Sequence, residues 1–322
     1  MNSKEAIRAF FETLFFAPRP YDYFFIIPLL PFSLLYGGAM LLRRYFAKRE
    51  KFPLPVVSIG NLQVGGSGKT PFAIALASRY PNSTIISRGY GRKSRGMIKV
   101  SHAGSISATV EESGDEAMLM ARSLPRSSVI VSEDRKAAIR KAISEGATLI
   151  ILDDGFNRVD IEKYEILLQP EKEANTLPFP AGPFREFSFV KRTADLVLIE
   201  KRDFDRKVSC SDPTERMLLV TAISHPERLE PYLPDGVVAR HYLPDHAYFD
   251  EEKLETLMRE CDAESLLVTQ KDVVKMEGFK LRLSIMELEL TIKREIAEKI
   301  DRYIREYRND TAESKGKQED EK

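Results

Sequence analysis

The residues whose types and spacing point most directly to chemistry lie in the stretch VVSIGNLQVGGSGKTP, from Val56 to Pro71. The β-branched run at its start predicts a short buried strand, and Pro71 favours the first turn of a helix. Backbone N–H groups of the glycine-rich turn between them can converge on a phosphate, and the helix dipole favours that anion. Lys69 can reach the β- and γ-phosphates, while the Thr70 hydroxyl takes Mg²⁺. The stretch predicts a nucleotide-binding loop whose contact residues are Gly65, Gly66, Ser67, Gly68, Lys69 and Thr70.

One position departs from the usual pattern G-x-x-x-x-G-K-[ST], because Gln63 stands where the pattern has glycine. A glycine-rich turn that ends in Lys-Thr by chance is the alternative interpretation. The strand expected before the loop and the helix expected after it favour phosphate binding, because that mechanism needs both.

Paired carboxylates follow a second apolar run, ATLIILDDGF at residues 147–156, which predicts a strand that ends in Asp153 and Asp154. Mg²⁺ is a hard cation that takes oxygen ligands, so a carboxylate at this strand end can complete its shell beside the loop hydroxyl. A polar strand terminus is the alternative, and the phosphate loop upstream favours the metal. The spacing leaves open which aspartate lies nearer the ion.

Two further charged segments are candidates for a site. The loop SRGYGRKSRG, residues 87–96, places four cations, Arg88 among them, directly after a predicted strand. Such a loop suits anion binding, and its place at the ligand-binding end of a parallel strand favours this over a solvated basic turn. Asp115 and Glu116 open a predicted helix, where ordinary helix capping is the alternative to catalysis or metal binding.

The order of predicted elements indicates an α/β protein: a P-loop NTPase-like parallel sheet domain, a second, smaller α/β domain and an N-terminal hydrophobic, membrane-associating helical segment. Predicted boundaries are 1–50 for that segment, 51–177 for the P-loop domain, 178–190 for a linker, 191–308 for the second domain and 309–322 for a disordered tail. The chain holds 49 Lys and Arg against 49 Asp and Glu, which argues against a general nucleic-acid binder. Two cysteines fit a reduced cytosolic protein.

The N-terminal segment is strongly apolar. Residues 3–16 show the periodicity of an amphipathic helix, and residues 23–42 contain no charge. An ideal helix of that length would span a bilayer core, although Pro28 and Pro31 interrupt it. A basic run at residues 43–51 follows and suits contact with anionic lipid head groups. We favour membrane association over a buried helical hairpin, and interfacial insertion slightly over a full span.

Eight motifs in this order carry a resemblance: VGGSGKTP, SRGYGRKSRG, SGDEAMLMA, SEDR, LDDGF, PAGPFRE, LPDH and TQKD. From about Leu54 to about Met276 the chain resembles the tetraacyldisaccharide 4′-kinase family of lipid A biosynthesis. The resemblance implies phosphoryl transfer from ATP, with Mg²⁺, to the 4′-hydroxyl of an acylated disaccharide 1-phosphate lipid. It also implies a place at the cytoplasmic face of the inner membrane. We expect a monomer, and the charge balance predicts that it does not bind nucleic acid.

The resemblance also implies roles for individual residues. Lys69 corresponds to the phosphate-binding lysine that acts in catalysis, Asp115 to the acid proposed as catalytic base, and His246 to the histidine that supports it. Positions implied for the metal are Thr70, Glu116, Asp153 and Asp154; positions implied for the substrate are Arg88, Arg185 and Glu186. The chain departs from the family pattern at Asn157 and Arg158, at Pro183 and Phe184, and at Gln270.

Two other classes of protein remain as alternatives. VGGSGKT also resembles the deviant loop of P-loop ATPase and GTPase switches, but that class has lysine where this chain has Val64. A membrane-bound scaffold with a vestigial loop is the third possibility. Against it stand the intact Lys69-Thr70 pair and the paired aspartates at positions 153 and 154.

Overall fold

The computed structural model describes the backbone of residues 3–65 and 68–320 and the side chains of residues 10–65 and 68–313. Gly66 and Ser67, two of the predicted nucleotide contacts, lie outside these residues. The chain divides into two compact units, each built from separate stretches of sequence. Unit 1 contains residues 1–69, 152–204 and 294–322, and unit 2 contains residues 70–151 and 205–293.

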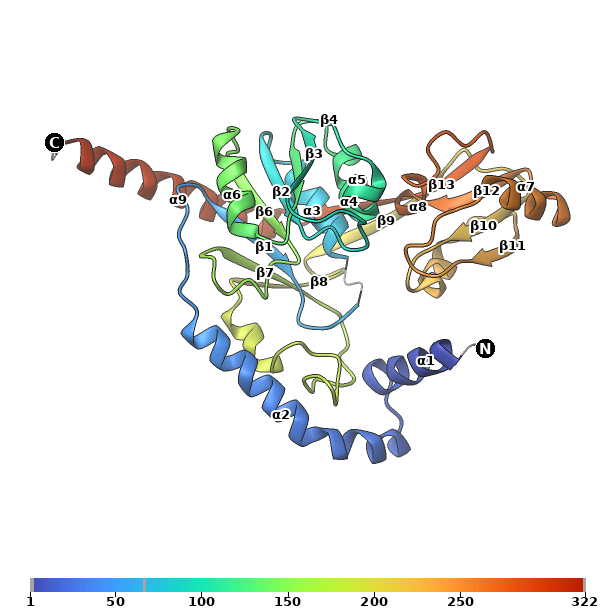
Figure 1. The fold of residues 1–322 in the computed structure, drawn as a ribbon, viewed down its shortest axis with the longest axis horizontal. Coiled ribbons are helices and arrows are strands. Elements are labelled where there is room, and N and C mark those ends of the chain that lie inside the picture. Colours follow the sequence, from blue (N-terminus) through green and yellow to red (C-terminus); the bar gives the residue numbers. More distant parts are fainter. Residues whose placement is uncertain (1–2, 66–67, 321–322) are drawn as a thin grey trace. The chain divides into compact units, whose positions relative to one another are not determined.

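Unit 1 contains the N-terminal helices, the strand before the phosphate loop and the C-terminal helix, which Figure 1 shows in blue and red at the two ends of the chain. Its elements are α1 (Ser3–Phe16), the 3₁₀ helix η1 (Pro20–Asp22), α2 (Tyr23–Phe46), β1 (Val56–Gly60), β7 (Tyr164–Gln169), the 3₁₀ helix η2 (Ser188–Thr193), β8 (Leu196–Ile199) and α9 (Arg294–Asp320). Strand β7 pairs in parallel with both β1 and β8. All five residues of β1 are buried, as its β-branched run predicts.

The first stretch of unit 2, residues 70–151, contains strands of the larger sheet and the helices between them. Its elements there are β2 (Ser83–Ser87), β3 (Ile98–His102), β4 (Ser105–Ile106), α4 (Val110–Ser113), α5 (Asp115–Ser123), β5 (Ser128–Val131) and α6 (Arg135–Ser144). Strands β2 and β5 are parallel, while β3 runs antiparallel to β5. Helices α4 and α6 begin at polar caps: the Thr109 hydroxyl accepts from the Glu112 N–H, and the Asp134 carboxylate accepts from the Ala137 N–H.

A second sheet of unit 2 carries the smaller α/β part predicted from the sequence. Its elements are β10 (Met217–Thr221), the 3₁₀ helix η3 (Pro226–Tyr232), β11 (Val237–Tyr242), α7 (Glu251–Glu260), β12 (Ser265–Thr269), α8 (Gln270–Val273) and β13 (Leu283–Ile292). With β9 (Phe204–Ser211), the strand order is β11-β10-β12-β13-β9. Leu254 and Met258 of α7 pack with buried leucines and valines of β10 and β12.

The larger sheet follows the order β4-β3-β5-β2-β6-β1-β7-β8. The division between the units passes within α3 (Lys69–Ala77), β6 (Leu149–Asp153) and β9. A large, mostly parallel sheet together with a second α/β sheet and an apolar N-terminal helix confirms the predicted fold class.

The structure differs from the sequence prediction at two places. The predicted linker at 178–190 is a packed part of unit 1, with Phe184 fully buried and Val190 nearly so. The tail predicted as disordered from residue 309 continues α9 to Asp320. Residues 309–320 lack apolar periodicity but are mostly helix-compatible, and extending an existing helix avoids the cost of nucleation.

Candidate active site

The phosphate loop is held from behind by the segment that carries PAGPFRE. The Val64 N–H donates to the Pro183 carbonyl at 2.9 Å, and the Arg185 N–H donates to the Leu62 carbonyl at 2.8 Å. Gln63 forms an isolated antiparallel bridge with Phe184. A residue that pairs like a strand needs no left-handed backbone, so this contact explains why glutamine is tolerated where the usual pattern has glycine. Gly65 and Gly68, in contrast, have φ values of +104° and +79°.

Lys69 lies at the start of α3 among oxygen atoms that come from the ends of strands. Its ammonium group donates to Asn61 Oδ1 at 3.0 Å and lies 3.6 Å from Asp154 Oδ1. The Asp154 carboxylate also accepts from the Arg185 guanidinium at 3.1 and 3.2 Å. Burial raises the pKa of Asp154, but the attraction of Lys69 and Arg185 outweighs it and lowers the pKa below 3.8. The carboxylate is therefore ionised, and two cations share one anion.

The two predicted aspartates differ in environment. Asp153 ends β6 and is buried, whereas Asp154 is partly exposed and takes a φ of +51° directly after the strand. A positive φ is unusual for a residue other than glycine or asparagine, and such backbone is concentrated at functional sites. The turn is held by the Gly155 N–H, which donates to the Ile59 carbonyl of β1 at 3.1 Å.

In unit 2, His246 contacts Asp115, the acid that the resemblance implies it supports. His246 Nδ1 lies 2.9 and 3.0 Å from the two carboxylate oxygens of Asp115. Asp115 opens α5 and is only 3% exposed. Burial raises the pKa of Asp115, but the hydrogen bond from His246 and the nearby charges of Lys271 and Lys275 together lower it below 3.8.

The predicted basic loop covers this pair. The Tyr90 ring lies 5.3 Å from the His246 ring, centre to centre. Gly91 has a φ of +79°, and a Cβ on it would come within 3.2 Å of His246 Nδ1. The loop therefore needs glycine at this position to approach the histidine closely. Arg88, the loop cation predicted to face substrate, is exposed immediately after β2.

Glu116, next to Asp115, faces both a hydroxyl and a cation. The Thr70 hydroxyl donates to Glu116 Oε2 at 3.4 Å, and the Lys271 ammonium group lies 3.4 Å from Glu116 Oε1 and 3.6 Å from Asp115 Oδ2. Burial lowers the pKa of Lys271, but Glu116, Asp115 and Asp245 outweigh it and raise the pKa above 10.5. The cluster is thus a set of carboxylates balanced by a charged lysine.

These residues fit a magnesium nucleotide, although the described part of the chain brings no three His, Cys, Asp or Glu side chains together as a metal site. Mg²⁺ in kinases takes one or two carboxylates and completes its shell with phosphate oxygens and water. The Thr70 hydroxyl beside the Glu116 carboxylate is a donor set of that kind. Of the predicted metal positions, these two are in contact, while Asp154 is paired with Lys69 and Arg185.

Glu186, predicted to face substrate, is engaged by another part of unit 1. It is 2% exposed, and the Arg44 guanidinium donates to its two carboxylate oxygens at 2.8 and 2.9 Å. Arg44 also stacks over the Phe156 ring and lies 3.8 Å from Glu165. We therefore expect Glu186 to anchor the end of α2 and to act on a ligand only through its neighbour Arg185.

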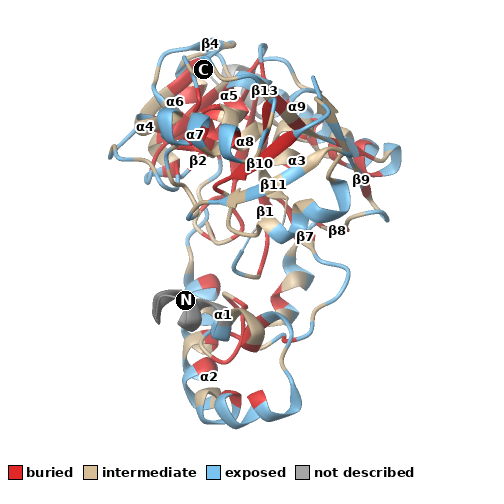
Figure 2. Cartoon of the chain, turned by 90° about the vertical axis from the view of Figure 1, so that its right-hand side faces the viewer, coloured by how far each residue is buried: buried red, intermediate tan, exposed pale blue. Residues whose placement is uncertain are grey.

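One face of α2 packs against the protein and the other does not. The buried positions of the helix are Ile26, Ser33, Gly37 and Arg44. At about 100° per residue they form a single stripe. Among the residues on the opposite side, 59–78% exposed, are Phe24, Leu35, Leu42 and Phe46. Figure 2 shows this pattern as isolated red bands on a mostly pale blue helix.

The packed stripe is fixed by specific contacts. The Ala181 N–H donates to the Ser33 hydroxyl at 2.8 Å, and a Cβ on Gly37 would lie 2.7 Å from the Phe187 ring. By length and composition alone, the stretch Pro20–Phe46 could cross a membrane.

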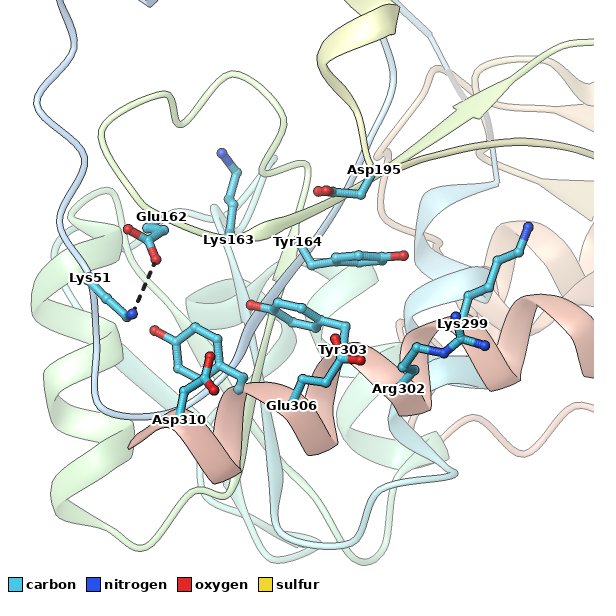
Figure 3. A pocket seen from close by; sticks show the side chains of 11 residues that line it. Lys51, Glu162, Lys163, Tyr164, Asp195, Lys299, Arg302, Tyr303, Glu306 and Asp310 are labelled. Carbon is cyan, nitrogen blue, oxygen red and sulfur yellow. Dashed lines mark ion pairs between the residues drawn. The ribbon is translucent and has the colours of Figure 1, made fainter. Parts of the chain in front are cut away.

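A cavity of about 470 Å³ in unit 1 lies away from the predicted residues (Figure 3). Its lining includes Tyr164, the first residue of β7, whose ring stacks on that of Tyr303 with centres 4.5 Å apart. The Tyr303 hydroxyl donates to the carbonyl of Val56, the first residue of β1. The cavity is therefore at the amino ends of these strands, whereas Asn61 and Asp154 follow the carboxyl ends of β1 and β6. Ligands of parallel sheets bind at the carboxyl ends.

Comparison with known proteins shows which family has this sequence and fold. Residues 25–305 match the family described as Tetraacyldisaccharide-1-P 4'-kinase. The chain belongs to this family. The Tetraacyldisaccharide 4'-kinase of Helicobacter pylori strain HPAG1 is 45% identical over 308 residues, which cover 95% of this chain and 98% of that protein. The protein of the same description from Aliarcobacter butzleri is 40% identical, over 90% of this chain and 94% of its own length.

A solved structure in the tetraacyldisaccharide-1-P 4'-kinase family has the same fold. The crystal structure of the "apo" form of LpxK from Aquifex aeolicus in complex with ATP matches with a TM-score of 0.74 at 29% identity. The match covers 88% of this chain and 99% of that one. Family membership agrees with the resemblance carried by the eight motifs and disfavours the nucleotide switch and the scaffold.

Three residues of these clusters were not predicted from the sequence. Asn61 follows β1 directly, and a polar residue at the carboxyl end of a parallel strand was a usable signal for it. Lys271 lies within the TQKD motif, but the sequence gives no sign that it reaches Asp115. Lys275 has no local signal, because its partners are more than 20 residues away along the chain, except Asp272.

Proposed function

We propose that this protein is a kinase that transfers the γ-phosphoryl group of ATP to the 4′-hydroxyl of a tetraacylated disaccharide 1-phosphate. The observation that carries the choice of a kinase is the contact of His246 with the buried Asp115 carboxylate. A kinase that phosphorylates a sugar hydroxyl needs a base to receive the hydroxyl proton. A nucleotide switch phosphorylates no sugar and needs no such base. Family membership and the phosphate loop support the same conclusion.

On the donor side, Lys69 is the residue for the β- and γ-phosphates. Its present partners, the Asn61 amide and the Asp154 carboxylate, are oxygen groups that phosphate oxygens can replace. Arg185 then keeps Asp154 neutralised. Mg²⁺ would be held by Thr70 and Glu116, and when bound it neutralises developing charge on the phosphates.

On the acceptor side, Asp115 receives the proton of the attacking hydroxyl. Its lowered pKa keeps it ionised at neutral pH, so it is ready to accept. A carboxylate of low pKa is a weak base, and transfer through a loose transition state requires proton removal only late in the reaction. His246 fixes the orientation of the carboxylate by bonding both of its oxygens.

The acceptor lipid requires the enzyme to work at a membrane, and we infer that α2 lies in the cytoplasmic leaflet of the inner membrane without crossing it. A spanning α2 would have to withdraw Ser33 and Gly37, in the middle of the helix, from Ala181 and Phe187 of the same unit. An interfacial helix keeps these contacts and inserts only the exposed apolar face. The basic residues 43–51 can then contact anionic head groups.

A direct assay tests the proposal. Purified protein is incubated with γ-³²P-ATP, Mg²⁺ and a tetraacylated disaccharide 1-phosphate in mixed micelles, and the lipid phase is scored for label. We expect label in the lipid that depends on both substrates. Release of inorganic phosphate without labelled lipid would identify an ATPase switch and refute the kinase.

A further inference from the structure

The motif TQKD carries the resemblance together with the others, but the proposed chemistry assigns it no role. It ends β12 and forms α8, where the Thr269 hydroxyl caps the helix by accepting from the Asp272 N–H. Its acid, Asp272, is fully buried, and its carboxylate accepts from the Thr221 hydroxyl at 2.6 Å, the Thr269 hydroxyl at 2.7 Å and the Ala222 N–H at 3.1 Å. An acid in the first turn of a short helix needs only its local partner Thr269, whereas Thr221 and Ala222 come from the end of β10.

The contact with Ala222 leads to the catalytic histidine. Ala222 directly follows β10, and its carbonyl accepts from the His246 N–H at 3.1 Å. Asp272 and His246 thus hold the two polar groups of one residue. His246 has a φ of +62°, a conformation that the surrounding structure must impose on a residue other than glycine. Fixing Ala222 therefore fixes the backbone from which the imidazole reaches Asp115.

A buried lysine completes the arrangement from the other side. Lys275 is 1% exposed, and its ammonium group donates to the carbonyl of Ala247, the residue after His246, at 3.1 Å. The same nitrogen lies 3.6 Å from Asp115 Oδ2 and 3.7 Å from Asp272 Oδ1, and 5.1 Å from the centre of the Phe249 ring. One cation thus contacts the catalytic carboxylate, the motif carboxylate and the histidine loop.

We propose that Asp272 and Lys275 are positioning residues that hold the His246 loop against Asp115. The proposal rests on the proposed function, because it assumes that the Asp115–His246 pair acts on the acceptor hydroxyl. Neither side chain is exposed enough to reach a substrate, so both act through the pair. Lys275 also balances two buried carboxylates, whose charges would otherwise repel each other across the loop.

The test compares Lys275→Met, which keeps the length of the side chain without its charge, with Lys275→Arg and Asp272→Asn. Lys253→Met, on the exposed surface of α7, is the matched control. Lipid phosphorylation is measured for kcat and for the KM of ATP, and near-UV circular dichroism verifies folding. We expect kcat to fall about 10–100-fold in Lys275→Met and Asp272→Asn, because part of the contribution of a positioned base is lost. The KM of ATP should change less than about threefold, and Lys275→Arg should restore part of kcat.

Each result has a distinct meaning. A folded Lys275→Met or Asp272→Asn with wild-type kcat would overturn the proposal. A parallel loss of ATP affinity and kcat in the folded variants would also overturn it, since that pattern indicates general damage. If Lys275→Met does not fold, Asp272→Asn, which is isosteric and keeps a carbonyl acceptor, still decides between these results. Absence of lipid phosphorylation in the wild type and in Lys253→Met would refute the proposed function instead.

Discussion

The substitution Arg44→Met tests how α2 is attached to unit 1. The Arg44 guanidinium bonds both oxygens of Glu186, and the two side chains are 7% and 2% exposed. After the substitution Glu165 keeps Lys163 at 2.6 Å, but Glu186 is left as a buried anion. Removing one partner of a buried ion pair costs about 3–5 kcal/mol. At about 1.4 kcal/mol per factor of ten, the equilibrium for detachment of α2 should rise roughly 140- to 4,000-fold.

Hydrogen exchange measures this equilibrium locally, because amides of a detached helix exchange through local opening. We expect peptides from the C-terminal half of α2 to exchange faster in Arg44→Met by that factor, while peptides from β10 and β12 stay unchanged. The double variant Arg44→Met/Glu186→Met removes both charges and should recover at least half of the protection, since apolar replacements of buried pairs are often neutral or stabilising. Unchanged exchange in Arg44→Met, or additive losses in the double variant, would refute the reasoning.

Three further predictions concern the phosphate loop, the exposed face of α2 and the tyrosine cluster. Lys69→Ala should lower lipid phosphorylation about 100- to 1,000-fold, because this is the usual cost of losing one group that stabilises transition-state charge. The free energy of unfolding should stay unchanged. Wild-type turnover in this variant would contradict the assignment of Lys69 to the phosphates. The double variant Leu35→Gln/Leu42→Gln should weaken binding to anionic vesicles by about 3–6 kcal/mol, at about 1.5–3 kcal/mol per apolar side chain. Vesicle sedimentation measures this binding. Equal binding of the variant and the wild type would exclude the exposed face of α2 as the membrane contact. Burial raises the pKa of Tyr303 above 10.0, so its contribution to stability is complete below pH 10 and is lost as pH rises from 10 towards the folded pKa. We therefore expect the free energy of unfolding of Tyr303→Phe, measured by denaturant titration, to fall less above pH 10 than that of the wild type. An equal fall in both proteins would argue against a contribution of the buried Tyr303 hydroxyl.

The local parts of the site were predictable from the sequence because each is encoded within a few residues. The strand, glycine turn and helix around Lys69 follow from residue types in one stretch, and so does the strand that ends in Asp153 and Asp154. The contact of His246 with Asp115 joins residues 131 positions apart, and only the family motifs suggested it.

What the sequence did not predict depends on pairing between distant segments. Gln63 looks like a defect in the motif until its bridge to Phe184 is known. Glu186 looks like an exposed charge, but its partner Arg44 lies 142 residues earlier in an apolar helix. The compact units also differ from the predicted boundaries, because a linear sequence does not reveal that α9 completes the unit that α1 begins.

The attachment of α2 has a consequence for the order of events during synthesis. Arg44 leaves the ribosome 142 residues before Glu186. At about 5–20 residues per second, the helix waits roughly 7–30 s for the segment on which it packs. During that interval the apolar face of α2 and the stripe of Ile26, Ser33, Gly37 and Arg44 are both uncovered, and a membrane surface is available to the apolar face before the protein partner is. On the proposed membrane contact of α2, docking to the later segment covers the packing stripe and leaves the apolar face in lipid, so the contact with the membrane precedes the completion of both compact units.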